Sequence, residues 1–452
     1  MSLVNRNVIS GFHNYNESEQ IHFAQMRRVL GDVYSRHGFV PFTPRPVERI
    51  EDLKIGGIGH QVYQIARMHD GTLTDIGLPY DRTIQLAIWI SQSANMISFP
   101  YKRQQIDYSW RGETPRAGRL RAFYQADVDI VGPNLSHMAD VECISTIYEG
   151  LEALGFSNFK MCINHIGISK AMIASLGFGA DQQKKILQLI DKLDKTPEEQ
   201  IVNEIYQLDT SKDIEEIKKI VSAFKYQGIL DEFQTKAEWG EAAATSVLLL
   251  KSIYSDLASY GLDTRKIYFS PGLARGLDYY TGVVFETLIE GQEDFGSVAS
   301  GGRYDNLVAG FSNTNMGSLP GVGGSIGLTR IFEIFMKTMI GNKKLSTIKS
   351  DADVVVFFHT DSERSKALHI AKALREAGKK VDLYSQGNEV RLGDKLTYAN
   401  KKGISRAIIV FDEEVSVKDL EKHTEEKFIQ TSDAVNYFLA DETVNGLFLS
   451  AM

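Results

Sequence analysis

Arginine and aromatic residues gather in the stretch Trp110–Arg121, which leads directly into the alternating segment Phe123–Asp129. Guanidinium groups bind phosphate oxygens through paired hydrogen bonds, and an aromatic ring offers a surface on which a base can stack. Alternate residues of a strand point to one side, so one face would carry Phe123, Gln125, Asp127 and Asp129. The combination suits a nucleotide site, although a solvated hairpin predicts the same alternation.

A second stretch, Arg275–Glu286, sets arginine beside glycine and contains the pair Tyr279 and Tyr280. Glycine lets a backbone approach a ligand closely, and tyrosine supplies both a ring and a hydroxyl group. The pattern is compatible with a ligand site. A hairpin whose tyrosines pack as ordinary core or edge residues is the alternative.

The third stretch, Gly321–Arg330, is rich in glycine and predicts a strand that turns into a helix. Such a turn can cradle a phosphate, but close packing of two backbones requires the same glycines. The stretch lacks the terminal Lys-Ser/Thr of a phosphate loop and does not fit the Rossmann fingerprint. Both interpretations therefore stay open.

No Ser/His/Asp set, metal-binding His/Cys cluster or nucleophile elbow is evident in the sequence. The ten histidines are scattered, and a lone one such as His165 is more often structural than catalytic. We therefore expect the chemistry to depend on positioning and charge stabilisation, without a protein nucleophile.

The elements that must position these residues follow two kinds of pattern, helical and strand-like, in the first part of the chain. Apolar positions at helical spacing predict a helix over 17–37, and an extended segment follows over 39–44. Strand-like runs continue to about residue 165, and examples are Thr83–Ile90, Arg121–Val131 and Lys160–Asn164. Helical patterns cover residues 168–262, and strand-like segments are predicted again over residues 267–309. This order predicts an α+β domain built on a mainly antiparallel sheet with flanking helices and a helical insertion.

The last hundred residues follow a polar stretch and alternate regularly between the two kinds of element. Strands are predicted over 353–358, 380–384 and 405–411, and helices over 362–377 and 393–402. Strict alternation implies a parallel sheet and a separate small α/β domain.

Composition limits the class of protein without naming it. A chain of 452 residues predicts two or three domains with ordinary cores. It has no run of eighteen apolar residues and no secretory signal pattern, and Cys143 and Cys162 lack metal-ligand spacing. We therefore expect a cytoplasmic protein with reduced thiols and no membrane association. The net charge of −8 points away from nucleic acid, because phosphate binding favours a basic face.

Taken together, these stretches resemble the histidyl-tRNA synthetases, a family of class II aminoacyl-tRNA synthetases. Residues 110–132 resemble motif 2, the Arg275 stretch is similar to a signature nearly private to the histidyl enzymes, and Gly321–Arg330 resembles motif 3. Gly38–Pro46 resembles motif 1, whose proline at the dimer interface matches Pro44. Ser300–Asp305 also matches, and the similarity runs from about Gly11 to past residue 410.

The resemblance implies an enzyme of protein biosynthesis that uses ATP and Mg²⁺. It would join histidine to ATP as histidyl adenylate and transfer it to the 3′ end of tRNA(His), working as a homodimer. It implies a catalytic domain over 1–335 that contains the helical insertion 168–262, a linker over 336–350 and an α/β anticodon-binding domain over 351–452. The insertion would contact the tRNA acceptor arm, and Lys395, Asn400 and Lys401 would be RNA contacts of the last domain.

The resemblance also implies how ATP is held. Arg111 would bind the α-phosphate, and Arg119 the γ-phosphate of a bent ATP. Glu113 would meet the adenine amino group, with Phe123 and Arg330 on the two faces of the ring. Ligands of Mg²⁺ stay unassigned.

For histidine, the resemblance implies three contacts to the ammonium group, from Asp81, Thr83 and Gln125. Tyr280 and Asp129 would reach the imidazole nitrogens, with Tyr279 beside them. Arg275 would lie against the α-phosphate and, with Arg111, stabilise the charge of the transition state. A pocket that hydrogen-bonds a polar side chain rejects apolar analogues strongly, so no editing domain is expected.

Two departures from the family pattern affect these expectations. Pro79 stands where the family has an arginine, and Arg82 is an uncommon addition that could supply the missing charge. Arg116 stands in the motif 2 loop where bacterial enzymes usually have glutamine, which puts recognition of the extra 5′ guanosine of the tRNA in doubt.

The alternative within this resemblance is not an enzyme. A paralogue of the synthetase binds histidine as a catalytically silent regulatory subunit of ATP phosphoribosyltransferase. That paralogue typically lacks the anticodon-binding domain and has lost ATP-binding arginines, whereas this chain retains Arg111, Arg119, Arg275 and Arg330.

Overall fold

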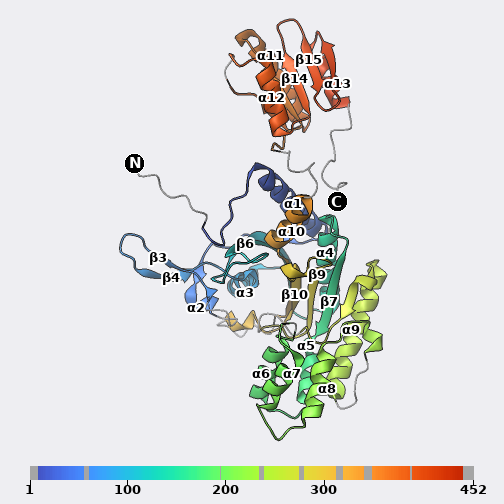
Figure 1. The fold of residues 1–452 in the computed structure, drawn as a ribbon. Coiled ribbons are helices and arrows are strands. Elements are labelled where there is room, and N and C mark those ends of the chain that lie inside the picture. Colours follow the sequence, from blue (N-terminus) through green and yellow to red (C-terminus); the bar gives the residue numbers. More distant parts are fainter. Residues whose placement is uncertain are drawn as a thin grey trace. The chain divides into compact units, whose positions relative to one another are not determined.

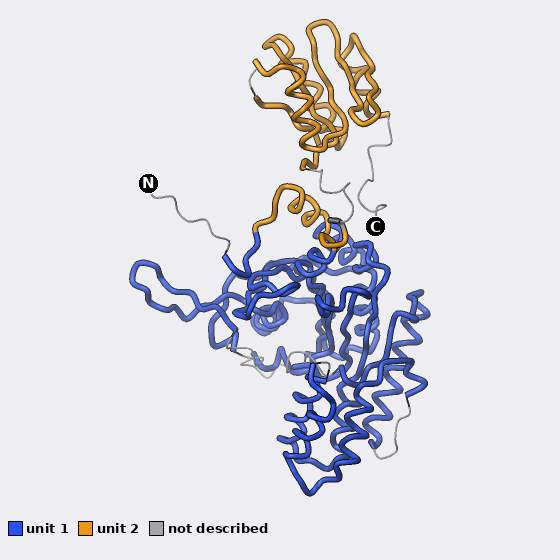
Figure 2. Tube along the Cα trace, in the orientation of Figure 1, with its two compact units in different colours: residues 1–13, 27–334 blue, residues 14–26, 335–452 orange. Residues whose placement is uncertain are grey.

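The computed structural model describes residues 9–54, 61–193, 195–233, 239–273, 279–311, 319–340, 349–386 and 389–440. These residues belong to two compact units, which Figure 2 colours separately. The first unit comprises residues 1–13 and 27–334, and the second comprises residues 14–26 and 335–452.

An eight-stranded sheet with the order β1-β5-β6-β11-β10-β9-β7-β8 forms the body of the first unit (Figure 1). The strands are β1 (Val40–Pro41), β5 (Tyr101–Trp110), β6 (Ala122–Val131), β7 (Phe159–His165), β8 (Ile267–Phe269), β9 (Val283–Ile289), β10 (Ala299–Tyr304) and β11 (Gly321–Ile326). Parallel pairs stand at the two edges, β1 with β5 and β7 with β8, and the pairs between them are antiparallel. The predicted mainly antiparallel sheet is confirmed.

Helices cover both faces of this sheet. α4 (Met138–Ala153) packs on one face so closely that a Cβ built on Gly324 of β11 would lie 2.8 Å from Ile147. α3 (Arg82–Ser93) packs against the other face, where Leu86 and Ile90 join Val131 and Tyr304 in one apolar cluster. The predicted first helix is α1 (Glu17–Arg36), and α10 (Leu328–Ile340) follows β11.

The strand predicted over Thr83–Ile90 is wrong, because these residues belong to α3. The Asp81 side chain caps this helix by accepting hydrogen bonds from the backbone N–H groups of Thr83 and Ile84, at 2.7 and 3.1 Å. Most of the helix is buried, so its apolar residues show no polar face. A short continuous apolar run is typical of a buried strand as well as of a buried helix, and periodicity cannot separate them.

Between β7 and β8 the chain forms a series of helices, α5 (Ile166–Ala174), α6 (Ala180–Ile190), α7 (Glu198–Tyr206), α8 (Ile214–Phe224) and α9 (Gly240–Tyr260). On α8, Ile217, Ile220, Val221 and Phe224 are buried, which is the spacing of one helical face. The chain leaves the sheet at β7 and returns on the neighbouring strand β8. Elsewhere in this unit, α2 (Ile50–Leu53) adjoins a small sheet of β2 (Glu48–Arg49), β4 (Leu73–Gly77) and β3 (Gln64–Ala66).

The second unit contains a five-stranded sheet with the order β13-β12-β14-β15-β16. Its elements are β12 (Val354–Phe357), α11 (Asp361–Glu376), β13 (Val381–Leu383), α12 (Leu392–Lys402), β14 (Arg406–Val410), β15 (Val415–Asp419), β16 (Thr424–Phe428) and α13 (Thr431–Ala440). The three predicted strands are β12, β13 and β14, and they are parallel. The antiparallel strands β15 and β16 were not predicted, because the charged, exposed sequence of β16 hides its strand character.

Lys395 does not fit its predicted role as an RNA contact. Its side chain is buried in the second unit, where Nζ donates to the carbonyl oxygen of Phe358 and lies 3.2 Å from Nδ1 of His359. Burial lowers the pKa of Lys395. Asn400 and Lys401 are exposed, so their contacts to RNA stay predictions.

Cys143 and Cys162 are both buried free thiols. Among the described residues, no helix combines the length and the apolar character needed to cross a membrane.

A histidine held by two glutamates connects three helices of the first unit. The ring of His37, directly after α1, lies 3.4 Å from Glu142 and 3.1 Å from Glu149 of α4. Lys102 of β5 lies 2.6 Å from Glu142, and the Tyr260 hydroxyl of α9 donates to Glu149. The hydrogen bond with Glu142 raises the pKa of His37, and the bond with His37 lowers the pKa of Glu142 to about 2.

We expect His37→Gln to destabilise the protein mainly in mildly acidic solution. The folded-state pKa of His37 is raised above 6.5. Its contribution to the free energy of unfolding is therefore complete below pH 6.5 and is lost as the pH rises through the folded-state pKa. Because the folded-state pKa of Glu142 is lowered, its contribution to the free energy of unfolding is complete above pH 4.5. Thermal unfolding should show a Tm loss of about 2 °C at about pH 5.5 and a much smaller loss at about pH 9. His69→Gln, at an exposed histidine, is the control and should change neither value. Equal losses at both pH values would contradict this assignment.

Candidate active site

A cavity of about 870 Å³ opens in the first unit, where the end of the β5–β6 hairpin faces the start of α10. Its lining includes all five side chains predicted for ATP, which are Arg111, Glu113, Arg119, Phe123 and Arg330. Gln125 and the segment 293–300 also line it. Segments far apart in the sequence therefore meet at one opening.

Three guanidinium groups approach one another in this cavity. Arg111 donates from Nε to the carbonyl oxygen of Tyr80 at 3.2 Å, and its guanidinium carbon lies 5.2 Å from the centre of the Phe123 ring. Arg119 pairs with Glu113 at 3.1 Å. Burial, together with the charges of Arg119 and Arg111, lowers the pKa of Arg330 to about 10. The cavity thus gathers more positive than negative charge, as a polyanionic ligand requires.

The loop between β5 and β6 is a tight turn held from two sides. Arg116 and Arg119 exchange two backbone hydrogen bonds, at 3.0 and 2.8 Å, and Gly118 between them has φ of +69°. The backbone N–H of Gly118 donates to Glu333 at 2.8 Å, while Arg330 donates to the carbonyl oxygen of Gly118 at 2.7 Å. The first turns of α10 therefore hold this arginine loop in place.

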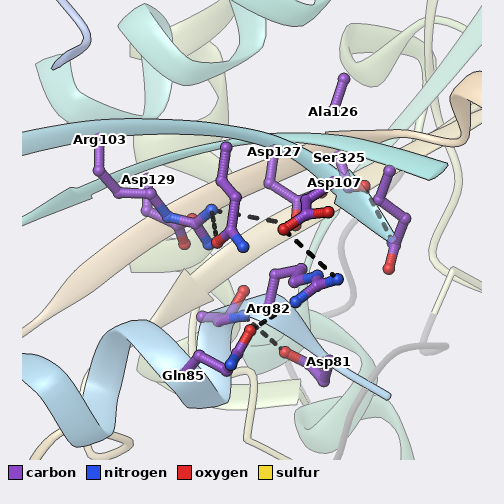
Figure 3. Close-up of polar contacts among 12 residues, drawn as sticks. Asp81, Arg82, Gln85, Arg103, Asp107, Ala126, Asp127, Asp129 and Ser325 are labelled. Carbon is purple, nitrogen blue, oxygen red and sulfur yellow. Dashed lines mark hydrogen bonds and ion pairs between the residues drawn. The ribbon is translucent and has the colours of Figure 1, made fainter. Parts of the chain in front are cut away.

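Beside the arginines, one face of the β5–β6 hairpin carries a polar row (Figure 3). The register sets Arg103 opposite Asp129, Gln105 opposite Asp127 and Asp107 opposite Gln125. Nη2 of Arg103 lies 2.6 Å from Oδ2 of Asp129, and the Tyr304 hydroxyl of β10 donates to Oδ1 of Asp129 at 2.6 Å. Gln125 accepts from Ser109 at 2.7 Å and donates to Ser325 of β11 at 3.0 Å.

Side chains from other segments complete this row. Tyr279 donates to Asp81 at 3.1 Å, and the rings of Tyr279 and Tyr280 meet edge to face with centroids 5.0 Å apart. Burial, followed by the charges of Asp81 and Asp129, raises the pKa of Tyr280, so these groups lie close together. Thr83, at the start of α3, also interacts with the Tyr279 hydroxyl.

The carboxylates of this row are buried and retain unused hydrogen-bonding capacity. Burial raises the pKa of Asp129 to about 7, against the opposing effects of Arg103 and Tyr304, and it raises the pKa of Asp127 as well. Within the part of the chain that the structure describes, neither Oδ2 of Asp129, which is in ion-pair contact with Arg103, nor Oδ1 of Asp127 accepts a hydrogen bond. A buried acceptor left without a donor is costly, so a ligand that brings N–H groups would be stabilised here.

The predicted substrate-binding residues Asp81, Thr83, Gln125, Asp129, Tyr279 and Tyr280 thus come together on one side of the sheet. Arg275, predicted as a catalytic residue, lies outside the described residues. Among the described residues, no group of three or more His, Cys, Asp or Glu side chains is arranged to hold a metal ion.

Arg82 and Pro79, the two departures in this region, occupy defined positions. Arg82 is the first residue of α3 and is buried. Its Nη1 donates to Gln85 of the same helix at 2.6 Å, and its Nη2 lies 4.0 Å from Asp107 of the polar row (Figure 3). The carbonyl oxygen of Pro79 accepts from the backbone N–H of Trp110 at 3.0 Å. Proline is tolerated because this segment uses its acceptor, and not a donor, to bind the end of β5.

Arg103 and Tyr304 also belong to this site, although the sequence did not lead us to predict them. A usable signal for Arg103 was present, because Arg103, Gln105, Asp107 and Ser109 alternate along β5 just as the predicted row alternates along β6. Tyr304 gave no such signal, since its contact with Asp129 depends on the order of the strands.

Comparison with known proteins identifies the architecture. A family model described as Histidyl-tRNA synthetase matches residues 11–331. The histidine–tRNA ligase of Clostridium tetani is 32% identical over 94% of this chain and 96% of its own length, and that of Rhodopirellula baltica is 31% identical over 90% of each. The crystal structure of histidyl-tRNA synthetase from Nostoc sp. PCC 7120 superposes with a TM-score of 0.83 at 30% identity, covering 97% of this chain and 99% of that one.

The sheet and its arginine-bearing hairpin are those of a class II aminoacyl-tRNA synthetase. Within that class, the chain belongs to the histidyl-tRNA synthetase family. An ATP phosphoribosyltransferase regulatory subunit/histidyl-tRNA synthetase from Bacillus halodurans shares the fold, with a TM-score of 0.72 at 17% identity.

We expect Gly323→Ala to impair the binding of histidine. A Cβ at this position of β11 would collide with Oδ1 of Asp129, whereas a Cβ on the neighbouring Gly324 points to the opposite face, toward Ile147. Histidine-dependent exchange of pyrophosphate into ATP should show a KM for histidine raised about tenfold in Gly323→Ala, with a smaller change for ATP. Gly324→Ala serves as the matched control, because it disturbs packing against α4 without touching Asp129. A similar rise in both variants would show that Asp129 is not the cause.

Proposed function

We propose that this chain activates histidine with ATP to form histidyl adenylate and pyrophosphate, and then transfers histidine to the 3′ end of tRNA(His). The observation that carries this proposal is the juxtaposition of two unlike sites on one hairpin. An arginine-rich cavity suits a polyphosphate, and the adjacent buried row of carboxylates suits a small ligand with N–H groups. Membership of the histidyl-tRNA synthetase family agrees with both halves.

For ATP, we assign Arg111 to the α-phosphate and Arg119 to the γ-phosphate. Adenine would lie between Phe123 and Arg330, with its amino group donating to Glu113. The position of all five side chains on one cavity supports this assignment. Mg²⁺ bound together with ATP would offset part of the charge of the phosphates.

For histidine, we assign the ammonium group to Asp81, Thr83 and Gln125, and the imidazole nitrogens to Asp129 and Tyr280, with Tyr279 beside them. The unused acceptor capacity of Asp129 supports the imidazole contact. An apolar analogue would leave these buried groups unpaired, so the pocket discriminates without a separate editing site.

The reaction then needs no protein nucleophile. The carboxylate of histidine attacks the α-phosphorus and pyrophosphate leaves. The terminal ribose hydroxyl of tRNA then attacks the carbonyl carbon of the adenylate, the bond from that carbon to the phosphate oxygen breaks, and AMP leaves as the hydroxyl group loses its proton. Arg111 and Arg275 would stabilise the negative charge that builds on the α-phosphate oxygens. The assignment of Arg275 rests on the similarity of its segment to the family, since it lies outside the described residues.

The remaining assignments concern the whole assembly. We propose a catalytic domain over 1–335, a linker over 336–350 and an anticodon-binding domain over 351–452, with the insertion 168–262 reaching the tRNA acceptor arm. We further propose a cytoplasmic homodimer whose interface includes the segment around Pro44. A net charge of −8 requires that contacts to tRNA be made by local basic patches.

The second candidate function is that of a catalytically silent, histidine-binding regulatory subunit of ATP phosphoribosyltransferase. The shared fold of the Bacillus halodurans protein keeps this candidate in view. The convergence of Arg111, Arg119 and Arg330 on one cavity favours the enzyme, because a subunit that binds histidine alone has no need of them.

We expect the purified chain to catalyse histidine-dependent exchange of pyrophosphate into ATP, and Arg275→Ala to reduce this exchange by about a hundredfold or more, as the loss of a transition-state donor predicts. Thermal unfolding should show that the variant is folded. Binding of histidine without any exchange in the unmodified chain would favour the regulatory subunit.

We expect Tyr280→Phe to weaken the binding of histidine more than the binding of ATP, since the change removes one hydroxyl group beside Asp129 and leaves the ring. In the same exchange assay the KM for histidine should rise about tenfold while the KM for ATP changes little. Tyr437→Phe, on α13 of the second unit, is the control and should leave both constants unchanged. Equal losses for both substrates in Tyr280→Phe would remove the imidazole assignment.

A further inference from the structure

Arg103 is a fully buried guanidinium group to which none of the assignments above gives a role. Its side chain is 0% exposed, and it lies on β5 directly opposite Asp129 of β6 (Figure 3). Nη1 donates to Gln105 of its own strand at 3.1 Å and lies 4.0 Å from Asp127. The bond to Gln105 fixes the direction of the guanidinium group independently of Asp129.

The contact between Arg103 and Asp129 supplies charge without occupying the acceptor. Nη2 lies 2.6 Å from Oδ2 of Asp129, which is the distance of a contact ion pair, and no hydrogen bond from another donor of the described residues reaches Oδ2. Tyr304 takes the other oxygen, Oδ1. Asp129 is therefore held at both ends of its carboxylate, while one oxygen keeps a lone pair for a ligand.

The surroundings of Asp129 would otherwise favour its neutral form. Among the described residues, the titratable groups that interact with Asp129 come from β5, β6, β10, α4, the start of α3 and the tyrosine pair, and they are Arg103, Asp127, Tyr304, Cys143, Asp81, Tyr279 and Tyr280, while Arg82 acts on the neighbouring Asp127. Of the groups that interact with Asp129, Arg103 is the cation, and Asp127 and Asp81 are acidic. A carboxyl group that is buried beside other carboxylates and lacks a cation keeps its proton in neutral solution.

We infer that Arg103 is a positioning residue that favours the ionised form of Asp129 and orients its carboxylate, so that the pocket recognises an imidazole N–H through a carboxylate acceptor. This inference rests on the proposed function, in which Asp129 meets the imidazole. A protonated Asp129 would have its own O–H donor directed into the pocket and would oppose the N–H of the ligand. Arg103 thus sets the pH range in which histidine is bound.

The test compares Arg103→Gln with Arg103→Lys, which keeps the positive charge. The KM values for histidine and for ATP are measured by pyrophosphate exchange between about pH 6 and pH 9. In Arg103→Gln, the midpoint below which histidine binding weakens should move upward by about one pH unit or more relative to the unmodified chain. The KM for histidine should be about tenfold higher near neutral pH and should approach the unmodified value toward the alkaline end. The KM for ATP should stay within about twofold, and Arg103→Lys should restore most of the original profile.

A merely structural role for Arg103 predicts a different outcome. It would raise the KM for histidine by the same factor at every pH and leave the midpoint unchanged, which overturns the inference. The double variant Arg103→Gln/Asp129→Asn is the matched control, because asparagine cannot titrate. Its pH dependence should match that of Asp129→Asn alone.

If Arg103→Gln does not fold, Asp129→Asn with Arg103 retained decides the question. Loss of the Asp129 midpoint, leaving only the titration of the imidazole of free histidine near its ordinary pKa of about 6.5, supports Asp129 as the titrating group, and an unchanged profile overturns the inference. Failure of the proposed function looks different, since the unmodified chain would then show no histidine-dependent exchange at any pH.

Discussion

The structure depends on the balance of charges that the β5–β6 hairpin buries on one face. Arg103, Asp127 and Asp129 are all withdrawn from water, where an uncompensated charge would cost several kcal/mol. The hairpin register sets opposite charges across the two strands, and Tyr304 adds a hydrogen bond from β10. The remaining acceptor capacity of the carboxylates stays unused until a ligand enters. Because these carboxylates are withdrawn from water, an unpaired acceptor among them costs free energy. A ligand that donates hydrogen bonds to them would therefore be preferred over one that cannot.

The β5–β6 hairpin connects this polar row to the arginine cavity. Arg111 and Arg119 lie at the loop end of the hairpin, and Gln125 and Asp129 lie further along the same strand, β6. Because α10 holds the loop through Gly118, both groups of side chains belong to one rigid element. Two substrates bound along such an element approach each other in a fixed orientation, and holding two reactants in register supplies much of a rate enhancement.

Local patterns in the sequence predicted much of this site, and they failed where a pattern had two meanings. Alternation along β6 correctly placed Gln125 and Asp129 on one face, but the partner row on β5 required the register of the hairpin. The apolar run of α3 was mistaken for a strand, since full burial removed the polar side that marks a helix. Lys395 was predicted to contact RNA, because the sequence does not reveal that its side chain is buried and donates to the carbonyl oxygen of Phe358. The motifs predicted which residues gather at the site, but which charged side chains are buried depends on tertiary contacts that the sequence does not reveal.

The glycines of β10 and β11 show how backbone space becomes part of a binding site. In the sequence the glycines of β11 were compatible with a phosphate cradle or with close packing, and the structure favours packing. A Cβ on Gly323 would collide with Asp129, and one on Gly302 would lie 2.9 Å from the ring of Tyr280. The glycines therefore leave room for the two side chains assigned to the imidazole, while α10 presents Arg330 to the cavity. Under this assignment, specificity for histidine would depend partly on the missing Cβ atoms, because the bare strand leaves the space that the Asp129 carboxylate occupies.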